Sequence, residues 1–198
     1  MIDPDTWDLA ALARLWPSAR PFPHVVIDEL VSPAELSTLQ TAFEEEPASE
    51  IRDDIFQMMA SALIPESAAF KRFATALQRQ EVLAAVRAIT GLEVRRVDAR
   101  AFAYLPGHYL LPHADLDAGR KRRVAYAFYI ACDDLEGGEL ELFDCEVTGE
   151  DIVATHPGPR LSPVANRLVL FAVTPSSLHR VREVTNGARL SIAGWFSA

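Results

Sequence analysis

The pattern of hydrophobic and polar positions changes near the middle of the chain. Before about residue 92 the apolar residues recur mainly at helical spacing. From Glu93 onward, short runs of valine, isoleucine, phenylalanine and tyrosine are separated by glycine, proline, aspartate and asparagine. Apolar residues at every third or fourth position favour helices, whereas short runs between turn residues favour strands. We therefore predict a mainly helical part over residues 1–92 and a strand-rich part over 93–198.

Two helical stretches are predicted in the first part. Residues 32–35 (Ser-Pro-Ala-Glu) combine an N-cap serine, a proline at the first helical position and a glutamate at the capping-box position. A helix should therefore begin there and continue to Phe43. A second helical stretch should begin near Pro65 and continue through Val86, with Gly91 as its C-terminal cap.

The second part is predicted to contain about eight short strands. No helical pattern separates them, which favours an antiparallel sandwich or jelly roll over a parallel sheet. No domain boundary is visible, so the expected fold class is α+β, with a single domain over 1–198 in which helices cover one sheet of the roll. The eight predicted strands lie near residues 94–105, 109–114, 123–131, 139–143, 151–155, 167–173, 178–183 and 188–196, and one further short strand is predicted before the helices, at residues 24–28.

Charge makes a nucleic-acid partner unexpected. The formal net charge is -9 and the pI is about 5.0, whereas binding to phosphates needs a basic face. The densest basic stretch, residues 119–123 (GRKRR), precedes a hydrophobic segment. Two interpretations stay open: a solvated loop, or arginines that rim a pocket for an acidic substrate.

Cellular context is predicted from what the sequence lacks. Two cysteines, Cys132 and Cys145, cannot form a disulfide framework or a thiolate metal site. The acidic start of the chain does not resemble a secretory or transit signal, and no apolar run approaches the roughly 20 residues that span a bilayer. We expect a cytoplasmic protein that is not bound to a membrane, and nothing in the sequence indicates its oligomeric state.

A candidate metal site begins with His113 and Asp115. Residues two apart on an extended chain project from the same side, so the imidazole and the carboxylate can reach one ion. His179, at the entry to a late strand, can supply a second imidazole, because distant strands lie side by side in a jelly roll. Two histidines and one carboxylate on one face of iron(II) leave positions open for a bidentate oxo-acid and dioxygen.

Arg189 adds an anchor for that oxo-acid. It follows His179 by ten residues, and Asn186-Gly187 between them is a strong hairpin signal, so we expect its strand to fold back beside that of His179. Its guanidinium could then bind the free carboxylate of 2-oxoglutarate in a bidentate manner. Ser191 faces the same way and could donate a further hydrogen bond. Taken alone, the His113–Asp115 pair could occur by chance, His179 could be a polar residue at a strand end, and Arg189 could be an ordinary exposed hairpin residue.

From about Asp98 onward the sequence resembles the prolyl 4-hydroxylase-like branch of the iron(II)/2-oxoglutarate oxygenases. The segment YLPGHYLLPHAD (104–115) is similar to that branch's pattern Y-x-x-G-x-x-[YL]-x-x-H-x-D, and Arg189 stands at the expected spacing after His179. Further segments that match are GGELELF (137–143), NRLVLF (166–171) and AGWF (193–196).

This resemblance implies a double-stranded β-helix (jelly roll, cupin-like) core and a dioxygenase reaction that uses Fe(II), 2-oxoglutarate and O2, with ascorbate as a stimulant. Its expected outcome is hydroxylation of an unactivated C–H bond in a prolyl or other residue of a peptide or protein, or in a free amino acid. The resemblance also implies that Tyr129 bonds the oxo-acid carboxylate while Tyr126 faces the other side, and that Tyr104 lines the same pocket. The presence of Asp115 disfavours a halogenase.

Two alternatives remain at this stage. A small-molecule tailoring oxygenase is one, since the short chain leaves little sequence for a long peptide groove. A non-catalytic cupin-like binding module is the other, although it would not need Arg189. His156 is a weaker candidate ligand in a proline-flanked turn, and Glu139 and Glu141 are expected on a solvated strand face.

Overall fold

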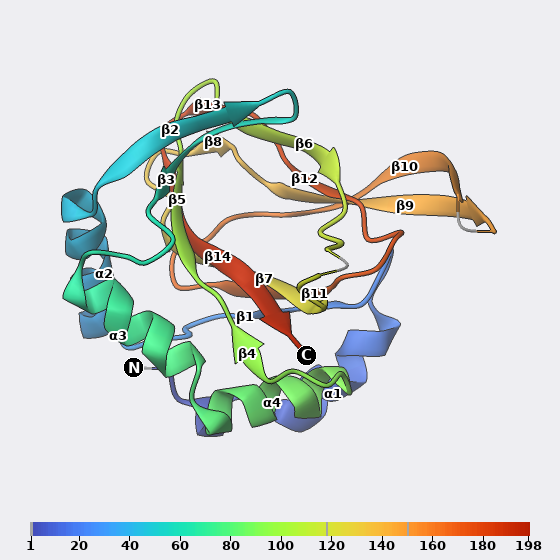
Figure 1. Ribbon diagram of the computed structural model, residues 1–198, viewed down its shortest axis with the longest axis horizontal. Coiled ribbons are helices and arrows are strands. Elements are labelled where there is room, and N and C mark those ends of the chain that lie inside the picture. The colour runs from blue at the N-terminus through green and yellow to red at the C-terminus, as the bar shows by residue number, and fades with distance from the viewer. Residues whose placement is uncertain (1, 118, 150) are drawn as a thin grey trace.

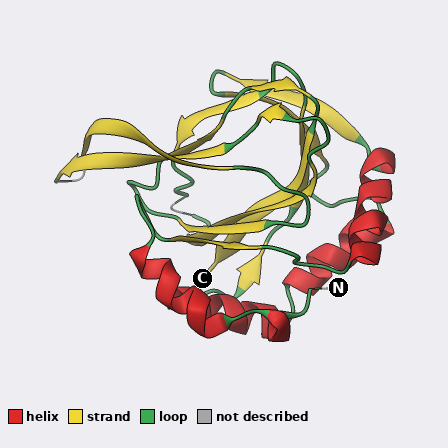
Figure 2. Cartoon of the chain, turned by 180° about the vertical axis from the view of Figure 1, so that it is seen from behind, coloured by secondary structure: helices red, strands yellow, loops and turns green. Residues whose placement is uncertain are grey.

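Strands from both parts of the chain form one curled antiparallel sheet, and the helices gather outside one side of it (Figures 1 and 2). This computed structural model describes residues 2–117, 119–149 and 151–198. The largest hydrophobic cluster lies between the helices and the sheet, and a second one lies inside the curl. The α+β jelly-roll prediction is therefore confirmed.

The predicted helix start at Ser32 and the predicted cap at Gly91 are both found, but the stretch predicted as one helix from Pro65 through Val86 consists of two helices. Ser32 Oγ accepts a hydrogen bond from the backbone N–H of Glu35, and Pro33 is the first helical residue. Gly91 ends the last helix in the left-handed conformation, at φ 69°. The helices are η1 (Pro4–Thr6), α1 (Leu9–Leu15), η2 (Trp16–Ser18), α2 (Pro33–Glu45), α3 (Ala68–Leu77) and α4 (Gln80–Thr90).

The main sheet has twelve strands, with the path β1-β11-β7-β14-β5-β3-β6-β12-β9-β10; β2 pairs with β3 and β4 with β14. β8 and β13 form a separate pair. The strands are β1 (His24–Ile27), β2 (Ala48–Asp53), β3 (Phe56–Ser61), β4 (Arg96–Val97), β5 (Arg100–Tyr104), β6 (Tyr109–His113), β7 (Arg122–Ala131), β8 (Glu136–Gly137), β9 (Leu140–Thr148), β10 (Asp151–Leu161), β11 (Leu168–Ala172), β12 (His179–Val181), β13 (Val184–Asn186) and β14 (Arg189–Ser197).

β14 separates two environments. Residues 190, 192 and 196 pack toward the helices, whereas residues 189, 191, 193 and 195 line a cavity inside the curl. This follows from the alternation of side chains along a strand. One strand thus contributes to the helix-side core and to the candidate site.

The β2–β3 hairpin was not predicted from the sequence. β2 is exposed at every position except Ile51, which is half-buried, so it has no alternating pattern that marks a strand. The hairpin belongs to the sheet because β3 pairs with β5 and β6, both more than 35 residues away. β10 also continues beyond the predicted end at residue 155, through Pro157 and Pro159. As the last strand of the sheet path, β10 tolerates residues that lack an N–H donor.

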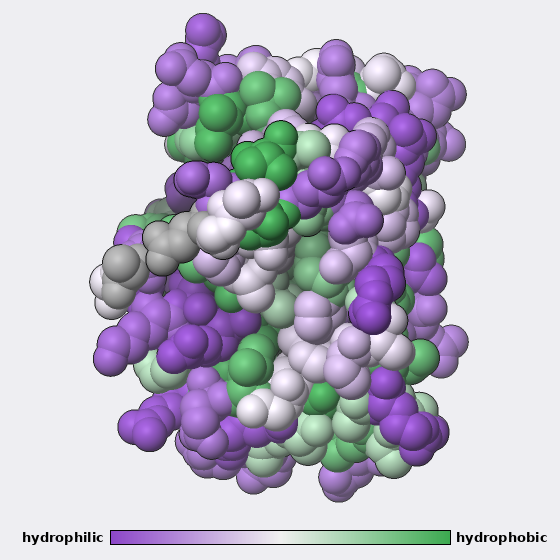
Figure 3. Space-filling model, turned by 90° about the vertical axis from the view of Figure 1, so that its right-hand side faces the viewer, coloured by the Kyte–Doolittle hydropathy of each residue, from purple (hydrophilic) through white to green (hydrophobic). Residues whose placement is uncertain are grey.

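The surface near the β9–β10 hairpin is mixed. In Figure 3, which shows the right-hand side of Figure 1, green hydrophobic patches lie between purple hydrophilic side chains. Among the described residues, no helix has both the length and the hydrophobicity that a bilayer crossing needs.

Candidate active site

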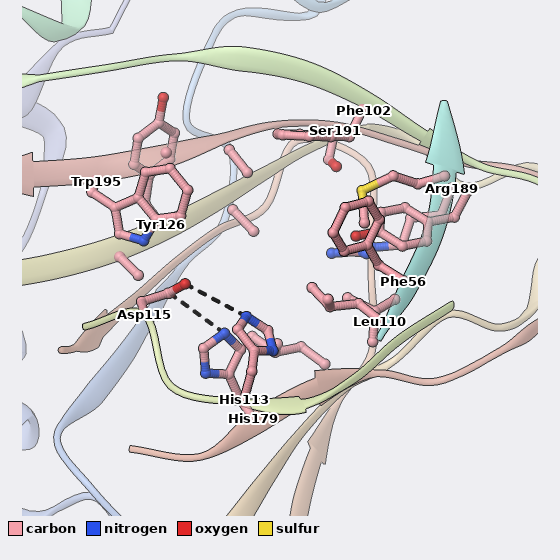
Figure 4. Close-up of a pocket in the computed structure, with 18 of the residues that line it drawn as sticks. Phe56, Phe102, Leu110, His113, Asp115, Tyr126, His179, Arg189, Ser191 and Trp195 are labelled. Carbon is pink, nitrogen blue, oxygen red and sulfur yellow. Dashed lines mark ion pairs between the residues drawn. The ribbon is translucent and has the colours of Figure 1, made fainter. Parts of the chain in front are cut away.

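A cavity of about 310 Å³ lies inside the curl of the sheet. His113, Asp115 and His179 lie at one end and Arg189 at the other (Figure 4). The wall between them is mostly apolar and includes Phe102. The cavity therefore has two separate polar ends within a hydrophobic wall.

The two histidines are direct cross-strand neighbours. His113, the last residue of β6, pairs with His179, the first residue of β12, and their ring centroids are 4.3 Å apart. Asp115 follows β6 and faces both rings: its two carboxylate oxygens each lie 3.5 Å from one histidine Nε2. One potential ligand atom from each residue lies within 4.8 Å of the others. The structure thus brings the three predicted ligands together.

Backbone carbonyls fix the orientation of both rings. His113 Nδ1 lies 3.0 Å from the carbonyl oxygen of Leu111, and His179 Nδ1 lies 3.0 Å from that of Ser177. A carbonyl can only accept, so Nδ1 carries the proton and donates, and Nε2 of the neutral ring keeps its lone pair toward Asp115. This arrangement is the usual one for metal-binding histidines, whose other nitrogen is bonded to a backbone or carboxylate oxygen.

Burial and the charges of neighbouring groups determine the protonation states of His113, Asp115 and His179. Burial lowers the pKa of His179 to about 4, and the neighbouring Asp115 opposes that effect only in part. Burial alone would lower the pKa of His113 and raise that of Asp115. The contact between these two residues outweighs it, so the pKa of His113 is raised and that of Asp115 is lowered. A neutral His179 beside an ionised Asp115 suits a divalent cation.

The opposite end of the cavity contains the buried cation of Arg189, which forms no salt bridge with any described residue. Arg189 is 3% exposed, and its guanidinium carbon lies 4.8 Å from the ring centroid of Tyr104 and 4.9 Å from that of Tyr129. Arg189 Nε and Nη1 and the Tyr129 hydroxyl have no hydrogen-bond partner among the described residues. Burial raises the pKa of Tyr104 to about 12, although Arg189 opposes this. Buried donors without acceptors are rare, so this end fits a carboxylate ligand.

The remaining predicted residues also have clear positions. Ser191 is buried and lines the cavity two residues after Arg189. Tyr126 and Tyr129 pack in different hydrophobic clusters, as predicted, and the Tyr126 hydroxyl donates to the carbonyl of Asp98. Tyr126 is nonetheless also among the residues that line the cavity (Figure 4). His156 is exposed and paired with Glu146, away from the cavity.

The predicted route of the chain to Arg189 was wrong. We expected a hairpin with the strands of His179 and Arg189 side by side, but β12 pairs with β6 and β9, whereas β14 pairs with β5 and β7. Gly187, at φ 72°, instead lies in a turn that leads from the β13–β8 pair into β14. Arg189 therefore lies across the cavity from His179, and the curl of the sheet brings them together.

Glu141 was also wrongly predicted to be solvated. Leu140 and Leu142 do face the inner core, but the Glu141 side chain on the other face is only 1% exposed. Arg160 Nε donates to it at 2.9 Å, and Arg180 also pairs with it. These arginines come from β10 and β12, and the sequence of β9 alone gives no sign of them.

Arg122 was missed as a neighbour of the site. Its Nη1 donates to the backbone carbonyl of Asp115 at 3.1 Å, and its guanidinium carbon lies 3.4 Å from the ring centroid of Trp195. The rest of the basic stretch, including Arg120, Lys121 and Arg123, is exposed. Arg122 therefore contacts two residues that line the cavity, whereas its basic neighbours are exposed.

A family model matches the second half of the chain. The sequence profile of the 2OG-Fe(II) oxygenase superfamily matches residues 99–197, half of the chain. That segment contains all three clustered ligand-type residues and Arg189.

Curated relatives match about half of this chain. Prolyl 3-hydroxylase OGFOD1 of Xenopus laevis is 36% identical over 116 residues, which are 54% of this chain and 21% of that protein. The Mus musculus protein of the same name is 35% identical over 113 residues, 54% of this chain and 20% of that protein. The chain thus spans about a fifth of the length of these relatives.

Solved structures share the fold over nearly the whole chain. A Pseudomonas putida prolyl-4-hydroxylase superposes with a TM-score of 0.69 at 19% identity, covering 94% of this chain and 98% of that one. A Trichoplax adhaerens prolyl hydroxylase, solved with a hypoxia inducible factor peptide fragment, gives 0.68 at 15% identity, covering 97% and 93%. At these identities the likeness concerns the fold.

Proposed function

Because the chain belongs to the 2OG-Fe(II) oxygenase superfamily, we propose that it hydroxylates an unactivated C–H bond with Fe(II), 2-oxoglutarate and O2. The observation that carries the proposal is one cavity with His113, Asp115 and His179 at one end and the unpaired Arg189 guanidinium at the other. A dicarboxylic oxo-acid has the matching chemistry, since it can chelate a metal at one end and present a free carboxylate at the other.

Each residue has a distinct role in this proposal. His113 Nε2, His179 Nε2 and one carboxylate oxygen of Asp115 hold the iron, and the carbonyls behind the two rings keep both nitrogens directed at it. Arg189 binds the distal carboxylate of 2-oxoglutarate, and the Tyr129 hydroxyl donates a further hydrogen bond.

Two more residues complete the oxo-acid end. The Tyr104 ring lies against the Arg189 guanidinium and keeps it in position, and Ser191 contributes a hydroxyl from the next inward-facing position of β14. With Fe(II) and 2-oxoglutarate bound, these groups would supply the oxidation by O2: one oxygen atom would enter succinate as 2-oxoglutarate loses carbon dioxide, and the other would enter the C–H bond of the substrate as a hydroxyl group. The apolar wall limits the entry of water to the reacting atoms.

The substrate class that we propose is a prolyl or other amino-acid residue in a peptide or protein, or a free amino acid. Support comes from the OGFOD1 relatives, named prolyl 3-hydroxylases, and from the Trichoplax structure with its peptide fragment. A small-molecule tailoring oxygenase is the alternative, and a panel of metabolites assayed beside proline-containing peptides separates the two.

The decisive experiment measures succinate. Purified protein with Fe(II), 2-oxoglutarate and ascorbate as reductant should release succinate, and mass spectrometry should detect one added oxygen atom on the peptide or amino acid that stimulates the release. Asp115→Ala protein should release none. If wild-type protein forms no succinate with any candidate, even uncoupled, the domain is a non-catalytic cupin-like module and the proposal is wrong.

We also propose a cytoplasmic location and one domain over residues 1–198. Support for the location comes from Cys132 and Cys145, which are both free thiols. Support for the single domain comes from β1, β2 and β3, which precede residue 92 yet belong to the main sheet. Fractionation of cells that express a tagged protein, and limited proteolysis, test these two points.

A further inference from the structure

Two buried N–H groups beside Asp115 have no acceptor. Trp195 Nε1 and Arg122 Nε lack a hydrogen-bond partner among the described residues. In Figure 4 the indole nitrogen of Trp195 lies on the edge of the ring nearest to Asp115. These donors lie at the metal end of the cavity, apart from those of Arg189.

Arg122 ties together the backbone of Asp115 and the ring of Trp195. One guanidinium nitrogen donates to the carbonyl of Asp115 at 3.1 Å, and the guanidinium stacks over the indole with its carbon 3.4 Å from the ring centroid. From the other side, Trp195 N donates to Asp98 Oδ1 at 2.7 Å. The indole is thereby held in place by β7 on one face and by Asp98 through its backbone.

The Asp115 carboxylate requires a hydrogen-bond donor that the two histidines cannot supply. Asp115 is 8% exposed, and each of its oxygens lies 3.5 Å from one imidazole nitrogen. A carboxylate that gives one oxygen to a metal keeps a second oxygen with negative charge, and a buried charged oxygen requires a donor. Neither histidine can donate from Nε2 once that nitrogen binds the metal. A donor from a neighbouring residue can meet this requirement.

We propose that Trp195 and Arg122 are positioning residues for Asp115, with the indole N–H donating to the carboxylate oxygen that does not bind the metal and Arg122 holding both partners in place. This inference rests on the proposed function, since it takes Asp115 as a metal ligand. The competing explanation is that the Arg122–Trp195 stack only packs the wall of the cavity. Packing requires only the aromatic ring of Trp195, whereas positioning requires its indole N–H. A substitution that keeps the ring and removes the N–H therefore separates the two explanations.

The first test is Trp195→Phe, which keeps an aromatic ring under Arg122 and removes the N–H. Co(II), which does not undergo the redox cycle of Fe(II), serves as the metal, and its affinity is measured by calorimetry. We expect roughly 10-fold weaker binding, the lower range for loss of an outer hydrogen-bond partner of a ligand. The visible absorption spectrum of bound Co(II) should change as well, because the Asp115 carboxylate is less constrained.

Trp7→Phe is the matched control. Trp7 Nε1 is likewise buried without a partner, but Trp7 belongs to the helix-side core. The same chemical change there should lower thermal stability without altering Co(II) affinity or spectrum. If both variants bind Co(II) with wild-type affinity and spectrum, the positioning role of Trp195 is refuted.

Arg122 gives a second, independent test in case Trp195→Phe fails to fold. Arg122→Met should weaken Co(II) binding, whereas Arg122→Lys, which keeps a donor and a cation near the indole, should restore part of it. Arg87→Met is the control, because Arg87 also donates to a backbone carbonyl, that of Val94, at 2.9 Å outside the cavity. Equal affinities for Arg122→Met and Arg87→Met would contradict the proposal.

Failure of this inference differs from failure of the proposed function. If His179→Ala binds Co(II) as well as wild type does, the metal site itself is misassigned. If His179→Ala abolishes binding and Trp195→Phe and Arg122→Met leave it intact, the site stands and only the positioning role is wrong. In the expected outcome, the affinity of the Co(II)-loaded Trp195→Phe protein for 2-oxoglutarate stays near wild type, since the Arg189 end is unchanged.

Discussion

The polar residues of the cavity differ in which of their atoms already have partners. His113 and His179 each direct Nδ1 at a backbone carbonyl, whereas the Arg189 guanidinium keeps two nitrogens unpaired. Backbone contacts thus satisfy the outer side of each imidazole, and the cavity side stays available. A substitution in the cavity can therefore remove one function without disturbing the contacts that support the fold.

Asp115→Ala should abolish metal binding and leave the fold intact. The residue follows β6 without being part of it, and its side chain faces the cavity, so removing it leaves a gap at a site that already contains open space. Calorimetry with Co(II) measures the loss, and circular dichroism with thermal melting measures the fold. A variant that still binds Co(II) with wild-type affinity would show that another residue supplies the carboxylate.

Arg189→Met should chiefly weaken the binding of 2-oxoglutarate. Removing one partner of a buried charged pair costs about 2–5 kcal/mol, so the Kd should rise at least about 30-fold. Titration of 2-oxoglutarate into Co(II)-loaded protein checks this. Binding of Co(II) itself is the internal control and should be preserved, and an unchanged Kd for the oxo-acid would mean that the anchor lies elsewhere.

Glu141→Gln should lower stability at neutral pH by about 2 kcal/mol, since Arg160 and Arg180 lose a buried ionic partner but can reach solvent. Burial would raise the pKa of Glu141, but the two arginines outweigh it and lower that pKa from its ordinary 4.5. A lowered pKa in the folded state stabilises the protein above about pH 4.5, and this contribution is lost as the pH falls through the folded value.

Urea unfolding at a series of pH values measures that contribution. The wild-type protein should lose stability below pH 4.5 more steeply than Glu141→Gln, and the two curves should converge in acid. Parallel curves over the whole range would show that the carboxylate is not preferentially ionised in the fold.

At the scale of elements, local sequence signals predicted what local interactions stabilise. The N-cap at Ser32 and the left-handed Gly91 marked helix ends, and both are found. β2 has no such signal, since its place depends on pairing with β3, which in turn pairs with β5 and β6. The position of β2 therefore depends on long-range strand pairing, which the local sequence pattern does not indicate.

The same limit applies within the site. The spacing of two between His113 and Asp115 is a local signal, and it predicted that both would reach one ion. His179 followed from the expected jelly roll, in which distant strands such as β6 and β12 lie side by side. Arg122 could not be predicted, since its contacts to Trp195 depend on the pairing of β7 with β14, about 70 residues apart. Burial of Glu141 depended likewise on arginines from other strands.

The turn at Gly187 should not tolerate an added side chain. A Cβ there would lie 2.4 Å from the carbonyl oxygen of Asp133, and φ is 72°, so Gly187→Ala should cost about 2–4 kcal/mol. Gly149→Ala is the control: its φ is 66°, but nothing lies within 4 Å of the added Cβ. Only the conformational cost of about 1 kcal/mol should apply there. Equal losses of unfolding free energy for Gly187→Ala and Gly149→Ala, measured in urea, would show that the loop at Asp133 moves to accommodate the added methyl group.

For the whole molecule, filling the cavity should raise thermal stability. Under the proposed function, metal and oxo-acid bind in the cavity inside the curled sheet, and a ligand at 100 times its Kd stabilises the folded state by about 2.7 kcal/mol. For a chain of this size that corresponds to a Tm increase of about 5–10 °C. Differential scanning fluorimetry with Co(II) alone and then with 2-oxoglutarate separates the two increments. Asp115→Ala should lose both, whereas Arg189→Met should lose only the second.

β14 has a consequence for how the protein can diversify. Its outward positions 190, 192 and 196 contribute to the helix-side core, whereas its inward positions 189, 191, 193 and 195 face the cavity. In a saturation library of this strand, substitutions at the outward positions should reduce protein abundance, whereas those at Arg189, Ser191 and Trp195 should reduce activity at normal abundance. Natural selection can thus vary the chemistry of the cavity and the integrity of the scaffold largely independently, although both are encoded in the same nine residues.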